Sequence, residues 1–206
     1  MNRSRLHPVY FGMTRSEERS LIERAIAGDR AAAETLIRAH QASLFAYMLR
    51  MTQRPELAED VVQDAFVRAI TNLDRFDFKF RFSTWLFTIA KRLWVNFSQK
   101  HRPSYDSDVV GAWEGKGNQP SGPTISSEVT ANAKVAIEYA LACLSEEQRE
   151  IVVLFHQLDW PICQIAEMMD MPEGTVKSHL HRGRQRMRVA LEEHERYRAF
   201  AEEVFA

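Results

Sequence analysis

Hydrophobic residues recur at intervals of three and four along most of the chain, which is the spacing of amphipathic helices. No convincing run of β-strands and no internal repeat interrupts this pattern, so we expect an all-α protein. The pattern is clearest from residue 172 onward, where one helical face is apolar. This apolar face consists of Val176, Leu180, Gly183, Met187 and Leu191.

Capping residues and helix breakers divide the first half of the chain into four predicted helices. Short polar side chains accept hydrogen bonds from the free N–H groups of a first turn, and proline fits there because it lacks an N–H. The predicted helix starts are the capping box of Thr14 and Glu17, Asp29, Pro55 and Ser83. The first helix is predicted to end at Gly28, the second at about Thr52 and the fourth before Pro103.

Three closely spaced helices are predicted between residues 145 and 190. Ser145 and Gln148 form a capping box for the first, and the second runs from Pro161 through Met169. A tight turn over residues 170–172 then leads into the helix with the apolar face. Two helices joined in this way form a helix-turn-helix, whose second helix enters the major groove of DNA.

The other faces of this last helix are basic and rich in hydrogen-bond donors, and Glu173 is its single acid between residues 172 and 190. A solvated basic face is the alternative interpretation of such a helix. The helix-turn-helix context favours DNA binding instead. The outward-facing residues are Thr175, Ser178 and Arg182, flanked by Lys177, His181, Arg184 and Arg188 on one side and by His179 and Arg186 on the other.

The 206-residue chain has a net charge of -1 and a pI near 6.7, so local basic patches must supply any attraction to DNA. We therefore expect DNA binding assisted by a partner.

Cys143 and Cys163 form no CxxC pair, and no histidine cluster has zinc-like spacing, so we expect no bound metal and no cofactor. Because the sequence shows no disulfide framework, the expected compartment is a reducing cytoplasm. We expect neither a signal peptide nor insertion into a membrane.

A segment rich in glycine, proline and serine separates two predicted helical domains. Four of the eight glycines and three of the seven prolines lie between Pro103 and Pro123, which predicts a flexible linker. The expected organisation is an N-terminal tail 1–13, a first domain 14–102, the linker 103–125, a second domain 126–193 and a C-terminal tail 194–206.

Two further stretches of the first domain carry candidate chemistry. Residues 58–66 combine an apolar row with the polar side chains of Asp60, Gln63 and Asp64, for which a solvated acidic face is the simplest interpretation. Residues 75–82 alternate aromatic and mostly basic residues. In a helical domain this alternation favours an extended loop with some phenylalanines in the core, although such a loop can also stack bases of single-stranded DNA.

These stretches together resemble the bacterial RNA polymerase sigma factors, specifically the extracytoplasmic-function (ECF) group. The resemblance covers roughly residues 14–193, and its motifs occur in the family's order on both sides of the linker. The matching motifs are residues 58–66, residues 82–86 running into 89–92, Leu144-Ser145 with residues 148–150, and residues 165–167 followed by 174–178.

The resemblance implies that the first domain binds core RNA polymerase and opens promoter DNA, and that the second reads the minus-thirty-five element. It implies an anti-sigma factor as a further partner, and no small-molecule substrate. The implied polymerase-binding residues are Asp60, Gln63 and Asp64; the minus-ten residues are Phe76, Phe78, Lys79, Phe80, Arg81, Trp85, Lys91 and Arg92; the minus-thirty-five residues are Thr175, Lys177, Ser178, His181, Arg182 and Arg184.

The chain departs from the family pattern at four positions: Asn96 replaces a common Asp, Ser98 and Gln99 replace basic residues, and His179 replaces a common Arg. A loss of charge at His179 predicts DNA binding that strengthens as the pH falls toward about 6.5.

Two other function classes account for less of the sequence than a sigma factor does. A regulator that binds duplex DNA without polymerase accounts for the helix-turn-helix but not for residues 58–66 and 75–82. An enzyme with a carboxylate metal site lacks the expected Glu-x-x-His or His-Glu-x-x-His motifs, so we expect no enzymatic activity.

Overall fold

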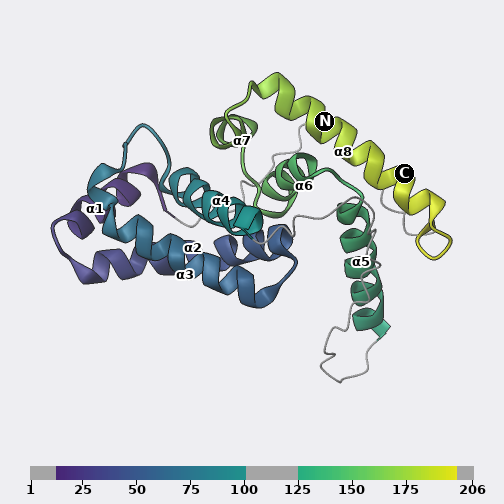
Figure 1. Ribbon diagram of the computed structural model, residues 1–206, viewed down its shortest axis with the longest axis horizontal. Coiled ribbons are helices and arrows are strands. Elements are labelled where there is room, and N and C mark those ends of the chain that lie inside the picture. Colours follow the sequence, from purple (N-terminus) through teal and green to yellow (C-terminus); the bar gives the residue numbers. More distant parts are fainter. Residues whose placement is uncertain (1–12, 101–124, 199–206) are drawn as a thin grey trace.

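The computed structural model describes residues 13–100 and 125–198, and these residues form helices joined by turns and loops, with no strand among them (Figure 1). The all-α prediction is therefore confirmed. Most of the expected tails and linker lie outside the described residues. The helices are α1 Arg15–Ile26, α2 Arg30–Thr52, α3 Pro55–Thr71, α4 Phe82–Lys100, α5 Ile125–Ala142, α6 Glu146–Val152, α7 Ile162–Met169 and α8 Glu173–Glu193.

The predicted caps form in most places. Thr14 and Ser145 make capping boxes with Glu17 and Gln148, and the Asp29 side chain accepts hydrogen bonds from the first turn of α2. Gly28 follows α1 with φ +93°, a conformation that a Cβ atom would strain. Local sequence alone therefore sets these helix boundaries.

The prediction that Ser83 caps α4 is wrong. The helix begins one residue earlier, at Phe82, and the Trp85 N–H already bonds the Arg81 carbonyl at 3.2 Å. The Ser83 side chain is buried and accepts a hydrogen bond from Gln164 Nε2 at 3.0 Å. Its hydroxyl serves a contact with α7, which no local cue in the sequence reveals.

Helices α1 to α4 pack around one apolar centre. The α3 face predicted from its spacing is buried, and α2 and α4 supply the facing side chains. The fully buried members include Leu36, Leu44, Met48, Ala65, Phe82, Leu86 and Phe87. This bundle holds the 75–82 loop at one end and leaves the outer face of α3 exposed.

Helices α7 and α8 form the predicted helix-turn-helix, and α6 packs against α8. Asp170 ends α7 in the left-handed conformation with φ 51°, and Pro172 precedes the first residue of α8. At Gly183 a Cβ atom would lie 3.1 Å from Val152 Cγ2, so the missing side chain lets α8 approach α6 closely. This contact fixes the outward face of α8.

The two groups of helices share one continuous core. Buried residues of α6, α7 and α8 belong to the same hydrophobic cluster as those of α2, α3 and α4. Figure 1 shows α7 beside α4, and α5 extending downward from below the C-terminal half of α8. Residues 13–100 are called the first half below, and residues 125–198 the second half. In the described part of the chain no helix is long and apolar enough to cross a membrane.

Candidate nucleic-acid interface

The N-terminal turns of α8 present a basic surface to solvent. Lys177, Ser178, His181 and Arg182 line a shallow hollow there. The Ser178 hydroxyl donates to the Gly174 carbonyl at 2.9 Å, and Arg182 Nε donates to the Ser178 carbonyl at 3.3 Å. These bonds hold two side chains along the helix. The structure thus brings together the residues predicted on this face, with Arg184 exposed nearby and Thr175 half-buried.

His179 does not belong to this surface. Its side chain is 16% exposed and its Nε2 lies 4.0 Å from Glu147 Oε2 of α6, an attraction that requires a protonated ring. The expectation that protonation of His179 strengthens DNA binding therefore loses its geometric basis.

The phenylalanines of the 75–82 loop differ in burial, with some in the core and others near the surface, as expected. Phe76 is 6% exposed and packs against Phe78 and Trp85, whereas Phe80 is 40% exposed. The burial of Phe76 removes it from direct reach of a nucleic acid. Its ring instead supports the part of the loop that carries Phe80 and the exposed Lys79.

Helix α1 secures this loop through polar contacts. A guanidinium N–H of Arg15 donates to the Lys79 carbonyl at 2.6 Å, and Arg19 lies over the Phe78 ring at 4.8 Å. Arg81 Nε lies 3.5 Å from the buried Glu18 carboxylate. Burial raises the Glu18 pKa, and Arg81 opposes that shift. Arg81 is therefore already engaged by a carboxylate within its own half.

The predicted nucleic-acid residues of α4 differ in accessibility. Arg92 is exposed and Trp85 is half-buried against Phe76 and Phe82. The Lys91 ammonium lies 2.9 Å from Glu150 Oε2 of α6. Neither Glu150 nor its contact with Lys91 was predicted, because a carboxylate between the apolar residues of a helix gives no sign of its distant partner.

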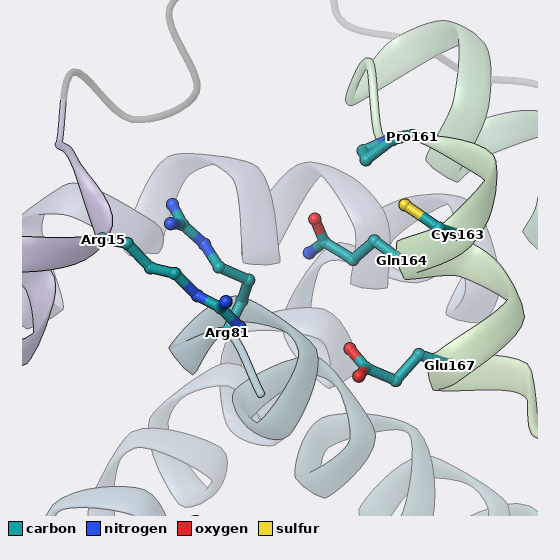
Figure 2. A pocket seen from close by; sticks show the side chains of 6 residues that line it. All are labelled: Arg15, Arg81, Pro161, Cys163, Gln164 and Glu167. Atoms are coloured by element: carbon teal, nitrogen blue, oxygen red, sulfur yellow. The ribbon is translucent and has the colours of Figure 1, made fainter. Parts of the chain in front are cut away.

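A cavity of about 460 Å³ opens where the two halves meet (Figure 2). Arg15 and Arg81 of the first half line one side, and α7 supplies the other with Cys163, Gln164 and Glu167. The arginines and Glu167 give its walls opposite charges. This cavity exists only because α7 packs beside the first half.

The outer face of α3 carries the predicted acidic surface. Asp60, Gln63 and Asp64 are all exposed, one helical turn apart or less. Val67 follows on the same side and is 64% exposed. An exposed apolar residue beside acids and an amide can form a protein-binding face, whereas nucleic acid would be repelled by the two carboxylates.

Comparisons with known families match both halves. Sigma-70 region 2 matches residues 36–103, and Sigma-70 region 4 matches residues 134–187. The first match includes α3, the 75–82 loop and α4. The second includes the helix-turn-helix and most of the basic face of α8.

Individual relatives align over nearly their whole length. The ECF RNA polymerase sigma factor SigW of Bacillus subtilis is 31% identical, with 82% of this chain and 94% of SigW covered. SigL of Mycobacterium tuberculosis, another ECF RNA polymerase sigma factor, is 34% identical, with coverage of 82% and 96%.

Two solved structures share the fold. CnrH, solved in complex with the cytosolic domain of CnrY, has a TM-score of 0.64 at 21% identity and covers 85% of this chain and 97% of its own. The Bartonella quintana sigma factor RpoE, solved with the anti-sigma factor NepR, has a TM-score of 0.58 at 22% identity, with coverage of 78% and 96%.

Proposed function

The chain belongs to the ECF group of sigma-70 RNA polymerase sigma factors, which direct core polymerase to promoters, and on this premise we propose how its surfaces divide the work. The outer face of α3 docks on polymerase, the 75–82 loop with α4 holds the minus-ten strand, and α8 reads the minus-thirty-five element. Polymerase supplies the chemistry, so this chain needs no catalytic residue. The chain therefore acts in the cytoplasm, where polymerase and DNA are found.

Asp60, Gln63 and Asp64 bind the clamp helices of the largest polymerase subunit. Their joint exposure on one face of α3 supports this role, as does the exposed Val67 beside them. A mixed polar and apolar surface suits a protein interface whose centre excludes water. The α3 acids therefore face polymerase rather than DNA.

The 75–82 loop and α4 hold the unpaired strand of the minus-ten element. Phe80 offers an exposed ring for stacking, worth roughly 1–3 kcal/mol per base, and Lys79 and Arg92 offer positive charge for phosphates. Phe76, Phe78 and Arg81 act by supporting the loop. Binding to the open strand favours melting, because it offsets part of the cost of unstacking the bases.

Helix α8 enters the major groove of the minus-thirty-five element. Lys177, Ser178, His181 and Arg182 lie exposed on its N-terminal turns, which is where a recognition helix meets base edges. Thr175 and Arg184 extend this surface along the helix. Arginine pairs with guanine through two hydrogen bonds, so Arg182 is the strongest candidate for base selection.

An anti-sigma factor controls the chain. The two solved neighbours are complexes, one with the cytosolic domain of CnrY and one with the anti-sigma factor NepR. The 31–34% identity to ECF sigma factors supports extending such control to this chain. The partner would cover at least one of the three surfaces described above.

The observation that carries the proposal is the presence, in one chain, of both sigma-70 regions with an exposed surface suited to each partner. The test is transcription with core polymerase on a library of promoter fragments, with and without this protein. We expect specific start sites that depend on the protein. A chain that binds duplex DNA unaided and never associates with polymerase would instead be a conventional helix-turn-helix regulator.

A further inference from the structure

The tip of the 75–82 loop is shaped by a local turn. The Phe80 N–H donates to the Asp77 carbonyl at 3.1 Å, and the Lys79 N–H donates to the Asp77 side chain at 3.0 Å. These bonds join close neighbours in the chain, so they set the course of the backbone within the turn. The position of the turn against the helical bundle depends on other contacts.

One face of α1 supplies those contacts. Glu18 and Arg19 lie three and four residues after Arg15, which places all three on the same side of the helix. The Arg15 guanidinium donates to the Lys79 carbonyl at 2.6 Å, and the Arg19 guanidinium lies 4.8 Å from the centre of the Phe78 ring. The helix therefore holds both the backbone of the turn and one of its aromatic side chains.

Glu18 holds the end of the loop where α4 begins. It is 5% exposed, and its carboxylate lies 3.5 Å from Arg81 Nε and accepts a hydrogen bond from the Phe82 N–H. Phe82 is the first residue of α4, and the N–H groups of a first helical turn have no partner within their own helix. A carboxylate at that end also faces the positive end of the helix dipole. Glu18 thus caps α4 from another helix, in place of the expected Ser83.

The two anchors of the loop form one network. A carboxylate buried to this degree is stable only where charges and N–H groups compensate for the loss of water. Burial raises the Glu18 pKa, whereas Arg81, the Phe82 N–H and Arg15 lower it. Arg15 therefore belongs to both anchors, because it also bonds the Lys79 carbonyl.

The exposed ring of the loop lies between these anchors. Phe80 is 40% exposed. The residue before it is held through its carbonyl by Arg15, and the residue after it is held through its side chain by Glu18. A backbone fixed on both sides limits the directions in which the ring can point. A strand that binds the ring then avoids much of the cost of ordering the loop.

These α1 residues precede the segment that matches the family model. Sigma-70 region 2 matches from residue 36 onward, whereas α1 ends at Ile26. The match to region 2 therefore assigns no role to Arg15 or Glu18. Their role follows from the contacts described above.

Resting on the proposed minus-ten role of the 75–82 loop, we propose that Arg15 and Glu18 are positioning residues for capture of the minus-ten strand. They act through the loop: Arg15 sets the place of the tip that carries Phe80, and Glu18 sets the junction of the loop with α4. Selectivity for minus-ten bases depends on both residues. Docking on polymerase and recognition of the minus-thirty-five element use other surfaces, on α3 and α8.

The first experiment measures the loop itself in the full-length free protein. Hydrogen–deuterium exchange followed by mass spectrometry reports on the backbone N–H groups of residues 76–82. Arg15→Ala should raise their exchange rate at least about threefold, because the loop loses a hydrogen bond that ties it to α1. Arg30→Ala is the matched control, since it removes another exposed arginine, at the start of α2. Exchange unchanged by Arg15→Ala would overturn the anchoring.

The second experiment measures promoter selectivity with core polymerase. On a promoter that the wild type transcribes, the bases of the minus-ten and minus-thirty-five elements are replaced one at a time. Arg15→Ala and Glu18→Gln should lose about threefold to tenfold of the discrimination at the minus-ten element, the range that one hydrogen bond commonly supports. Discrimination at the minus-thirty-five element should be kept. An equal loss at both elements, or no loss with the exposed Arg15, would overturn the inference.

The third measurement separates positioning from a direct phosphate contact by Arg15. The affinity of core polymerase loaded with this protein for a fluorescent single-stranded DNA of mixed sequence is measured between about 50 and 200 mM salt. Each phosphate contact that is lost makes the slope of log affinity against log salt shallower by about 0.7. Arg15→Ala should leave the slope unchanged, whereas Arg92→Gln should make it shallower. The same change in both variants would show that Arg15 touches the strand and would overturn the positioning role.

Failure of the proposed loop function would give a different result. Wild-type transcription that is insensitive to minus-ten bases would contradict the assignment of the 75–82 loop to that element. The exchange experiment needs neither polymerase nor promoter, so it reports on the anchoring in either case. Faster exchange in Arg15→Ala together with unchanged minus-ten selectivity would overturn the positioning role alone.

Discussion

At the scale of single residues, the environment of a side chain changes its role more than its type does. Lys91 and Arg92 are adjacent basic residues of α4, yet Arg92 faces solvent whereas Lys91 pairs with a buried carboxylate. Phe76 and Phe80 differ in the same way within one loop. Judged by residue type alone, all four side chains would contact DNA. Burial distinguishes them, because Phe76 and Lys91 are engaged within the protein whereas Phe80 and Arg92 are exposed.

Arg182→Ala should weaken recognition of the minus-thirty-five element by about 1–3 kcal/mol if the guanidinium reads a base edge. The measurement is run-off transcription from promoters that differ in that element. Arg188→Ala is the control, because Arg188 lies six residues further along α8 and pairs with Glu192 at 2.6 Å. Promoter selectivity that is unchanged by Arg182→Ala would contradict base contact.

His40 should make the protein less stable in mild acid. Burial, with a smaller contribution from the positive charge of Arg81, lowers the His40 pKa to about 4. An unfolded histidine titrates near about 6.5, so the neutral ring stabilises the fold fully above that pH. Between about pH 6.5 and 4 we expect a loss of up to about 3 kcal/mol from this residue.

The check on His40 is urea unfolding across that pH range, compared with His40→Leu. The variant should show a smaller fall in unfolding free energy. Glu18 contributes in the opposite direction, because burial raises its pKa. The quantity to compare between the wild type and His40→Leu is therefore the slope of unfolding free energy against pH. Equal slopes in the two proteins would count against the role of His40.

At the scale of elements, each surface helix has one face for packing and one for a partner. Helix α3 buries its apolar row and exposes its acids, while α8 buries Val176 and Leu180 and exposes its basic N-terminal turns. The spacing of apolar residues already determines these faces. What each face meets depends on the neighbouring helices.

The double change of Gln63 and Asp64 to alanine should weaken binding to core polymerase at least about tenfold, which is about 1.4 kcal/mol. Both side chains are exposed, so the fold should be unaffected. A pull-down with purified core polymerase measures the effect. Glu34→Ala removes an exposed acid of α2 and should bind as the wild type does; equal binding by all three proteins would exclude the α3 face.

Gly183→Val should destabilise the helix-turn-helix by about 1–3 kcal/mol through overpacking, because even a Cβ atom there would lie 3.1 Å from Val152. Thermal unfolding followed by circular dichroism measures the shift. Gly174→Val is the control, since a Cβ atom at Gly174 meets nothing within 4 Å. An equal loss in both variants would point to helix propensity alone.

At the scale of the whole molecule, weak sites gain strength by being held together. The net charge of -1 limits unaided binding to DNA, and the basic surfaces on α4 and α8 are small. Attachment of both halves to polymerase raises the effective concentration of each for its promoter element.

The shared core predicts that the two halves unfold together. In calorimetry the wild type should give a single transition. Glu150→Ala, which deprives Lys91 of its buried partner, should split or broaden that transition. Two resolved transitions in the wild type would show that the contact between the halves contributes little to stability.

Much of this architecture is predictable from the sequence because it depends on neighbours in the chain. The capping boxes at Thr14 and Ser145 join residues three apart. The apolar stripe of α8 follows the helical repeat, and its basic N-terminal residues follow from it. Local rules therefore suffice for the helices, the helix-turn-helix and the family.

Which helix faces are exposed and which are covered depends on the tertiary structure alone. Tyr47 and Glu150 are 103 residues apart in sequence, and their hydrogen bond exists only because α6 packs on α2. The same packing pairs Lys91 with a carboxylate and turns Ser83 from an expected cap into a partner of Gln164. Helix periodicity fixes the direction of a side chain relative to its own axis, whereas the position of that axis against another depends on the fit of the whole core.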